Sequence, residues 1–169
     1  DKDIFEETSV NEYIVNPCNC VGVSGAGFAR EIKKRFPLQE KEYVKICKQR
    51  ILNLGGVFVS PPIVFLPTKN HWKDIYKRTS FPEKIYPYTT LVDTFSEDFL
   101  FNMIKKSFDC LEEYPNMNMP LLGCGLAGGN PYKFLHMMKK NFEKRNRIYK
   151  IFVNRKEINE EELNKVLYV

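Results

Sequence analysis

Two glycine-rich turns constrain this chain more than any other feature of its sequence. The first occupies residues 22–27 and the second residues 123–129, and each follows a short apolar segment, residues 13–15 and 119–122. Each turn leads into a segment whose apolar residues recur at helical spacing. Glycine lets a backbone turn its N–H groups toward one point, and the start of a helix adds partial positive charge. Strand, glycine turn and helix, repeated twice, therefore predict an α/β fold with two anion-binding loops.

The remaining segments continue the alternation of strands and helices. Pro37 ends the helix after the first turn, Thr94 and Glu97 form a capping box, and Asn130-Pro131 is a typical helix start. A further helix is expected at 38–50, followed by a hairpin or a bent strand at 57–59 and 63–66 and a long surface excursion at 67–91. After it we expect a helix from the capping box to about 113, a strand at 148–153 and a last helix at 159–166.

Length and composition fit one compact, soluble domain. The chain has 169 residues, of which 43% are hydrophobic, enough to build a core. Its longest apolar run, residues 63–66, is far shorter than the about 18 residues that span a bilayer. The sequence begins at Asp1 without an initiator methionine or an apolar leader, which is compatible with a missing first strand.

The five cysteines indicate reduced thiols rather than disulfides or a metal centre. Their number is odd, and Cys18 and Cys20 have the wrong spacing for a zinc site. We expect no metal, no cofactor and a cytoplasmic location. The net charge of +5 is uneven, with six basic residues and one acid between 139 and 150. One interpretation of this run is a basic face that binds nucleic acid. The alternative is that it reflects the general abundance of Lys and Asn in the chain.

Two glycine turns in one small sheet suggest a diphosphate held between them. Open α/β sheets bind ligands at the carboxyl ends of their strands. Neither turn has the G-x-G-x-x-G order of a dinucleotide fold or the Gly-Lys-Ser/Thr ending of a P-loop. Asn16 and Asn19 stand where an apolar strand ends, and a short amide there can bind two ligand oxygens. The plainer alternative is that the glycines serve only as tight turns and the asparagines serve turns as well.

Residues 14–37 resemble a macro domain, the ADP-ribose-binding α/β module. Residues 66–72 and 122–129 resemble the branch of this family that contains DarG-type DNA ADP-ribosyl glycohydrolases. The resemblance implies a three-layer α/β/α fold with a mixed central sheet, one domain over residues 1–169. It implies that Asp3 and Ile4 hold adenine, Asn19 the distal ribose, and the two glycine turns the phosphates. The candidate ligand-binding residues are Asp3, Ile4, Asn16, Gly22, Val23, Ser24, Gly25, Ala26, Gly27, Phe28, Thr68, His71, Trp72, Gly123, Cys124, Gly125, Leu126, Ala127 and Gly128.

Lys69 and Asn19 are the candidate catalytic residues. Lys69 matches the lysine that this branch uses to remove ADP-ribose, either as a cation or proton donor or, with a lowered pKa, as a nucleophile. His71 and Trp72 beside it are suited to contact a base. Two related mechanisms are disfavoured, because no acid follows Leu126 closely and no Asp follows Phe28 in the next helix.

The expected function is hydrolytic removal of ADP-ribose from a modified substrate, thymidine in DNA being the leading one. The alternatives are an ADP-ribose 1''-phosphate phosphatase, a non-catalytic ADP-ribose reader, and a binder of some other nucleotide. The expected partners are ADP-ribose or an ADP-ribosylated macromolecule and single-stranded DNA, and we expect a monomer with no membrane contact.

Overall fold

A mixed five-stranded sheet forms the centre of the molecule. The computed structural model describes residues 2–77, 90–114, 116–143, 148–154 and 158–167. The strand order is β2-β3-β1-β6-β7. Strands β1, β3, β6 and β7 are parallel and β2 runs antiparallel to β3 at the edge, which makes the sheet mixed as predicted. The bounds are β1 Tyr13–Asn19, β2 Phe58–Ser60, β3 Ile63–Lys69, β6 Asn116–Met119 and β7 Ile148–Ile151.

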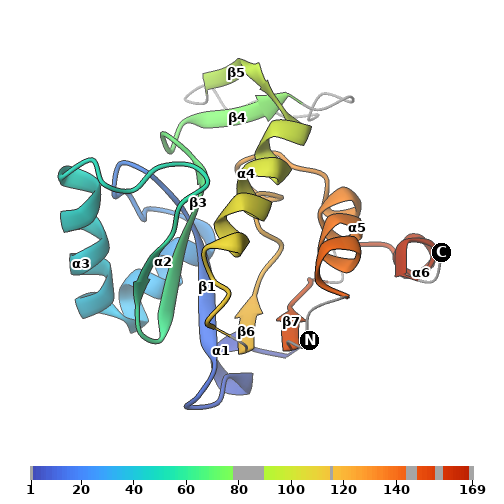
Figure 1. The fold of residues 1–169 in the computed structure, drawn as a ribbon, viewed down its shortest axis with the longest axis horizontal. Coiled ribbons are helices and arrows are strands. Elements are labelled where there is room, and N and C mark those ends of the chain that lie inside the picture. Colours follow the sequence, from blue (N-terminus) through green and yellow to red (C-terminus); the bar gives the residue numbers. More distant parts are fainter. Residues whose placement is uncertain (1, 78–89, 115, 144–147, 155–157, 168–169) are drawn as a thin grey trace.

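Helices cover both faces of this sheet and give three layers (Figure 1). Side chains alternate between faces along a strand, so Ile14 of β1 packs toward α2 (Gly27–Arg35) and α3 (Pro37–Lys48). The next residue, Val15, packs toward α4 (Glu97–Asp109) and α5 (Pro131–Phe142). The expected α/β/α architecture is confirmed.

Three smaller elements lie around these layers. A short helix, α1 (Ile4–Glu7), precedes β1, and α6 (Glu160–Leu167) contacts α5 near the carboxyl terminus. Strands β4 (Asp74–Lys77) and β5 (Thr90–Ser96) form a separate parallel pair next to α4. The sequence pattern predicted neither α1 nor this second sheet.

Several expected boundaries are wrong. Strand β3 continues through Lys69 because residues 67–69 are buried, so the expected surface excursion begins later and contains β4 and part of β5. Residues 78–89 of that excursion lie outside the described part. Thr94 belongs to β5, and α4 begins at Glu97, so the capping box does not start the helix.

The strand expected at 119–122 is also misplaced, since β6 ends at Met119. The sequence pattern missed this strand because it contains the polar residue Asn118. In the fold, the amide of Asn118 is buried and hydrogen-bonded to other polar side chains. The helix expected at 38–50 spans Pro37–Lys48, β7 ends at Ile151, and the last helix is shifted by one residue. Asn130 caps α5 as predicted and accepts from Tyr132 N and Lys133 N.

Candidate ligand-binding cleft

A cavity of about 1510 Å³ lies where the carboxyl ends of the parallel strands meet. It is lined by Asn19 at the end of β1, by Lys69 at the end of β3 and by residues 151–154 at and after the end of β7. Both glycine turns and the start of α1 complete its walls. This is the edge at which open α/β sheets bind their ligands.

Most of the candidate residues line this cavity, and five do not. Asn16, Gly22, Ser24, His71 and Gly128 lie outside the lining. Those that line it are Asp3, Ile4, Asn19, Val23, Gly25, Ala26, Gly27, Phe28, Thr68, Lys69, Trp72, Gly123, Cys124, Gly125, Leu126 and Ala127. The residues of the lining that sequence reasoning missed are Lys2, Phe5, Pro17, Cys18, Ala29, Pro120, Leu121, Pro131, Ile151, Phe152, Val153 and Asn154.

The first glycine turn presents an open backbone surface at the start of α2. A Cβ added at Gly25 or Gly27 would meet no atom within 4 Å, so neither glycine is required by packing against the protein. Gly27 has a φ of 56°, in the left-handed region. Ala26 precedes the helix and supplies no side-chain cap to the first N–H groups of α2. These N–H groups suit an anion such as a phosphate.

The second glycine turn packs against α4 at Gly123 and is open at Gly125. Gly129 N donates to Gly123 O at 2.7 Å, and a Cβ at Gly123 would lie 3.2 Å from side-chain atoms of α4. A Cβ at Gly125 would meet nothing within 4 Å. Gly125 therefore has room for a ligand beside it, whereas Gly123 is fixed by its packing.

Glu97 secures the end of this second turn. Its buried carboxylate accepts from Asn130 N at 2.7 Å and pairs with Lys133 Nζ at 2.7 Å. The pairing raises the pKa of Lys133. The first residue of α4 therefore fixes the start of α5, which orients the turn between them.

Asn19 holds the first glycine turn in place. Its Nδ2 donates to Val23 O at 2.7 Å, and its Oδ1 accepts from Val21 N and Val23 N. The hydroxyl of buried Tyr43 donates to Asn19 O at 2.7 Å. Asn19 lines the cavity, yet the bonds of its side chain position the turn. Asn16 is fully buried within β1, and neither polar atom of its side chain has a hydrogen-bond partner among the described residues.

Lys69 stands directly opposite Asn19 at the end of the neighbouring strand. Its side chain is 9% exposed, and Nζ donates to Trp72 O at 2.9 Å and to Asp74 O at 3.4 Å. Burial lowers the pKa of Lys69 to about 8, and the nearby charge of Asp74 opposes that change. At neutral pH the ammonium form predominates, and the free amine becomes available within about one pH unit.

The turn at residues 70–74 places an indole next to this lysine. Cys20 N donates to Asn70 O at 3.0 Å, and Asp74 Oδ2 accepts from His71 N, so the turn is fixed to the end of β1 and closed on itself. Trp72 lines the cavity and is 36% exposed, with Lys73 Nζ 5.2 Å from its ring centroid. The exposed indole offers a flat apolar surface to a base or another ring.

At the other end of the cavity, α1 brings in an aromatic pair. Phe5 stacks on Phe28 with ring centroids 5.4 Å apart, and Arg35 lies over the Phe5 ring. Asp3 caps α1 by accepting from Phe5 N and pairs weakly with Arg35 at 3.8 Å. Nothing in the sequence pattern indicated Phe5, because its place depends on how α1 packs against α2.

The thiols of Cys18 and Cys20 are poor nucleophiles. Cys18 lines the cavity, and burial raises its pKa well above the ordinary value. Burial likewise raises the pKa of Cys20 to about 11. Within the described residues, no group of three or more His, Cys, Asp or Glu is placed to hold a metal ion, and no helix is long and apolar enough to cross a membrane.

Part of this chain is similar in sequence to proteins of known activity. No family model matches the chain. A DNA ADP-ribosyl glycohydrolase of Mycobacterium tuberculosis is 39% identical over 70 residues, 37% of this chain and 20% of that protein. An ADP-ribose 1''-phosphate phosphatase of Meyerozyma guilliermondii is 36% identical over 63 residues, 37% of this chain and 36% of that protein. The chain thus aligns with only about a fifth of the length of the glycohydrolase.

Solved structures have a similar fold over nearly the whole length of this chain. The macrodomain of Mycobacterium tuberculosis DarG has a TM-score of 0.65 at 23% identity and covers 90% of this chain and 93% of its own. Thermosipho africanus DarTG in complex with ADP-ribose has a TM-score of 0.68 at 20% identity, covering 95% of this chain and 43% of its own. The sheet and the helices on its two faces have the fold of the DarG macrodomain. The chain is therefore similar in sequence to a DNA ADP-ribosyl glycohydrolase over 70 residues, and similar in fold to the DarG macrodomain over nearly its full length.

Proposed function

We propose that this macro domain binds ADP-ribose and hydrolyses the bond between ADP-ribose and a nucleic-acid base, thymidine in single-stranded DNA. The observation that carries the proposal is the placement of Lys69, a buried amine with a lowered pKa, in the same cavity as two open glycine turns. We place the diphosphate between the two glycine turns and the adenine near α1, because residues of both turns and of α1 line the cavity. One chain supplies every one of these groups, so we propose that the domain acts as a monomer.

The proposed chemistry follows from the position of the lysine. Water adds to the anomeric carbon as the glycosidic bond to the base nitrogen breaks, and the base nitrogen takes up a proton. A cation beside the leaving base stabilises the negative charge that develops there. Nζ of Lys69 donates two of its hydrogens to backbone carbonyls. Its third hydrogen is available to form a hydrogen bond with the leaving base or to be transferred to it. We therefore assign the ammonium form to the reaction.

A phosphatase acting on ADP-ribose 1''-phosphate is the second candidate. Sequence similarity to the fungal phosphatase favours it, and it would use the same cavity. It would release inorganic phosphate rather than a base. The identity of the product therefore separates the two candidates.

The deciding experiment measures release of ADP-ribose from a thymidine-ADP-ribosylated single-stranded oligonucleotide. We expect turnover by the wild type, and a loss of about 10²-fold or more in Lys69→Ala with ADP-ribose affinity retained. Lys105→Ala is the matched control, since this exposed lysine lies on α4 away from the cleft.

Each other outcome rejects the proposal in a defined way. An unchanged rate in Lys69→Ala would remove the lysine from the reaction. Phosphate release from ADP-ribose 1''-phosphate with no action on the oligonucleotide would favour the phosphatase. Tight binding of the intact oligonucleotide without cleavage would indicate a reader.

A further inference from the structure

We propose that the outer face of α3, defined by Lys41, Lys45 and Lys48, binds the phosphate backbone of the nucleic-acid strand whose modified base enters the cleft. This inference rests on the proposed function, since it names where the rest of that substrate lies. It concerns a helix that contributes no residue to the cavity.

This part of the sequence is one of two stretches rich in positive charge, the other being residues 139–150. Residues 30–50 contain eight Lys and Arg and three Glu, a net charge of +5, which equals the net charge of the entire chain. Of the three acids in this stretch, Glu31 pairs with Lys34, Glu40 is buried, and Glu42 is exposed and accepts from Ser60 Oγ. The surface therefore presents mainly positive charge, which attracts polyanions.

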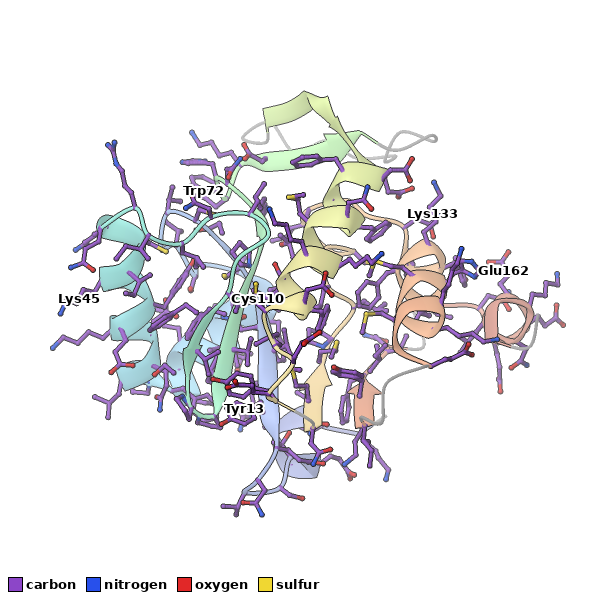
Figure 2. The ribbon with its side chains drawn as sticks, in the orientation of Figure 1. Tyr13, Lys45, Trp72, Cys110, Lys133 and Glu162 are labelled. Atoms are coloured by element: carbon purple, nitrogen blue, oxygen red, sulfur yellow. The ribbon has the colours of Figure 1, made fainter. Side chains whose placement is uncertain are left out.

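The three lysines form one row on the helix. Spacings of four and three residues put Lys41, Lys45 and Lys48 on the same side, opposite the buried Tyr43. All three are exposed, and none forms an ion pair with an acid in the described part of the chain. Figure 2 shows Lys45 on the outer side of α3, away from the sheet. The row is about 10 Å long, which is comparable with several phosphate spacings of a stacked strand.

Residues 20–23 lie between α3 and the cleft, since Gly22 packs on α3 and Val23 lines the cavity. Gly22 of the first glycine turn packs on α3, so that a Cβ there would lie 3.3 Å from Val44 Cα and from Cys47 Cβ. The end of β1 is bonded to the turn that carries Trp72, through Cys20 N and Asn70 O. The exposed side chains of Val21 and Val23 lie between the two. A strand leaving the cleft at Trp72 thus passes over residues 20–23 and reaches the last turn of α3.

Backbone contacts of this kind do not depend on base sequence. Lysine ammonium groups neutralise phosphates and release counterions, so they supply affinity that falls as salt rises. The exposed indole of Trp72 then stacks on a base of the strand, an interaction that any base can form. The division of roles predicts that removing the lysines weakens binding of the strand and leaves binding of ADP-ribose unchanged.

The test compares wild type with the triple variant Lys41→Gln, Lys45→Gln, Lys48→Gln. A second triple variant, Lys105→Gln, Lys140→Gln, Lys165→Gln, removes the same charge from exposed positions on α4, α5 and α6. Fluorescence anisotropy of a labelled, unmodified single-stranded oligonucleotide is recorded over a series of salt concentrations. We expect the α3 variant to bind at least ~10-fold more weakly and its salt slope to fall by about 2, because three phosphate contacts are lost.

Turnover assays distinguish this inference from the proposed function. The α3 variant should show a raised KM on the ADP-ribosylated oligonucleotide, with unchanged ADP-ribose affinity and unchanged turnover of an ADP-ribosylated nucleoside. Equal oligonucleotide binding by wild type and the α3 variant, or an equal loss in the control variant, would overturn the inference. If the lysines govern oligonucleotide binding but the wild type cleaves no modified oligonucleotide, the proposed function fails and the binding surface stands.

Discussion

Lys69 is a charged group kept in a place that disfavours its charge. A pKa near 8, against 10.5 for an ordinary lysine, means that burying the ammonium costs about 3 kcal/mol. Two donated hydrogen bonds return about 1 kcal/mol each. A residue that destabilises the fold yet occupies a ligand cavity is typical of a functional group.

Replacing this lysine should therefore stabilise the protein at neutral pH. Below pH 8 the lysine is charged in both the folded and the unfolded chain, so the whole burial cost is present. Between pH 8 and 10.5 the unfolded chain holds more protons than the folded one, and the stability of the wild type rises. We expect Lys69→Met to raise Tm at pH 7 by about 2–4 °C, and to lower it near pH 10, where most of the burial cost is gone and the lost hydrogen bonds outweigh the remainder.

Thermal unfolding of Lys69→Met and of the control Lys105→Met, recorded from pH 7 to pH 10, checks this expectation. The control should differ from wild type by the same amount at every pH, because that lysine is exposed. A Lys69→Met variant less stable than wild type at pH 7 would show that the ammonium is better solvated than its burial indicates.

At the same scale, the sequence predicted residue types better than their roles. Lys69 and four of the six candidate glycines line the cavity where the motifs suggested, but the side chain of Asn19 is bonded to the glycine turn and Asn16 is buried outside the lining. Phe5 was missed because its contact with Phe28 joins two segments distant in sequence. A local pattern does not encode which side chains meet across elements.

At the scale of elements, most units with local signals were predicted well, and the capping box at Thr94 and Glu97 is the exception. Glycine turns, the Asn130-Pro131 helix start and the helix break at Pro37 depend on neighbouring residues alone. Strand β6 was misplaced because its polar residue Asn118 is satisfied by partners more than 100 residues away. The end of β3 was misplaced for a similar reason, since only burial beside β1 makes residues 67–69 a strand.

The second glycine turn gives a direct test of the site. Gly125→Glu places a carboxylate in the space beside the turn, where no protein atom lies within 4 Å of the new Cβ. We expect ADP-ribose affinity measured by calorimetry to fall at least ~100-fold, because a fixed negative charge repels a diphosphate. Tm should change little, since Gly125 has no positive φ and its Cβ position is open.

Gly125→Gln is the matched control of nearly equal size without the charge. It should lower ADP-ribose affinity only through its size, and therefore less than Gly125→Glu does. Equal affinity in wild type and Gly125→Glu would mean that the turn serves only the fold.

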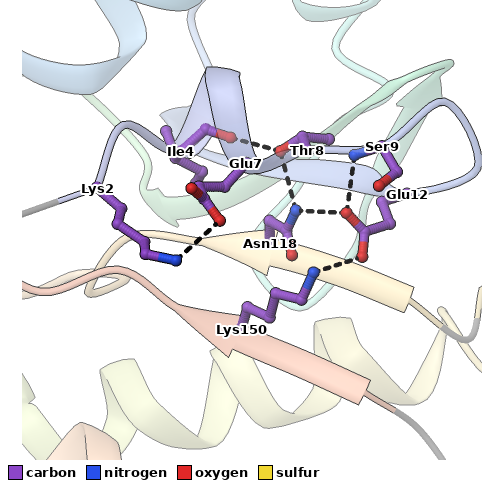
Figure 3. Close-up of polar contacts among 8 residues, drawn as sticks. All are labelled: Lys2, Ile4, Glu7, Thr8, Ser9, Glu12, Asn118 and Lys150. Carbon is purple, nitrogen blue, oxygen red and sulfur yellow. Dashed lines mark hydrogen bonds and ion pairs between the residues drawn. The ribbon is translucent and has the colours of Figure 1, made fainter.

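At the scale of the whole molecule, a polar network joins the first residues of the chain to the far strands of the sheet. Glu12 accepts from Lys150 of β7 at 2.8 Å, from Asn118 of β6 at 3.1 Å and from Ser9 N at 2.9 Å (Figure 3). Asn118 also donates to Thr8 Oγ1, which in turn donates to Ile4 O at the start of α1. The network thereby fixes α1, whose first residues line the cavity.

These bonds, led by the one from Lys150, lower the pKa of Glu12 to about 2 from an ordinary 4.5. A carboxyl whose pKa is depressed on folding stabilises the fold above pH 4.5, and that contribution is lost as the pH falls toward 2. We expect Glu12→Gln to lower the free energy of unfolding at pH 7 by about 1 kcal/mol, since Lys150 is 46% exposed and solvent screens the pair. The difference from wild type should shrink below pH 4.5. ADP-ribose affinity should fall as well, because α1 loses its attachment to β6 and β7.

The matched control is Glu7→Gln on α1, whose partner Lys2 is 72% exposed, so that Tm and affinity should both stay near the wild-type values. Amide hydrogen exchange of residues 3–8 gives the structural readout and should become faster in Glu12→Gln alone. If both variants behave alike at pH 7, the network does not hold α1 at the cavity. If Glu12→Gln lowers Tm but leaves exchange and affinity unchanged, the network stabilises the sheet and the adenine end of the cleft is ordered by the packing of Phe5 on Phe28 instead.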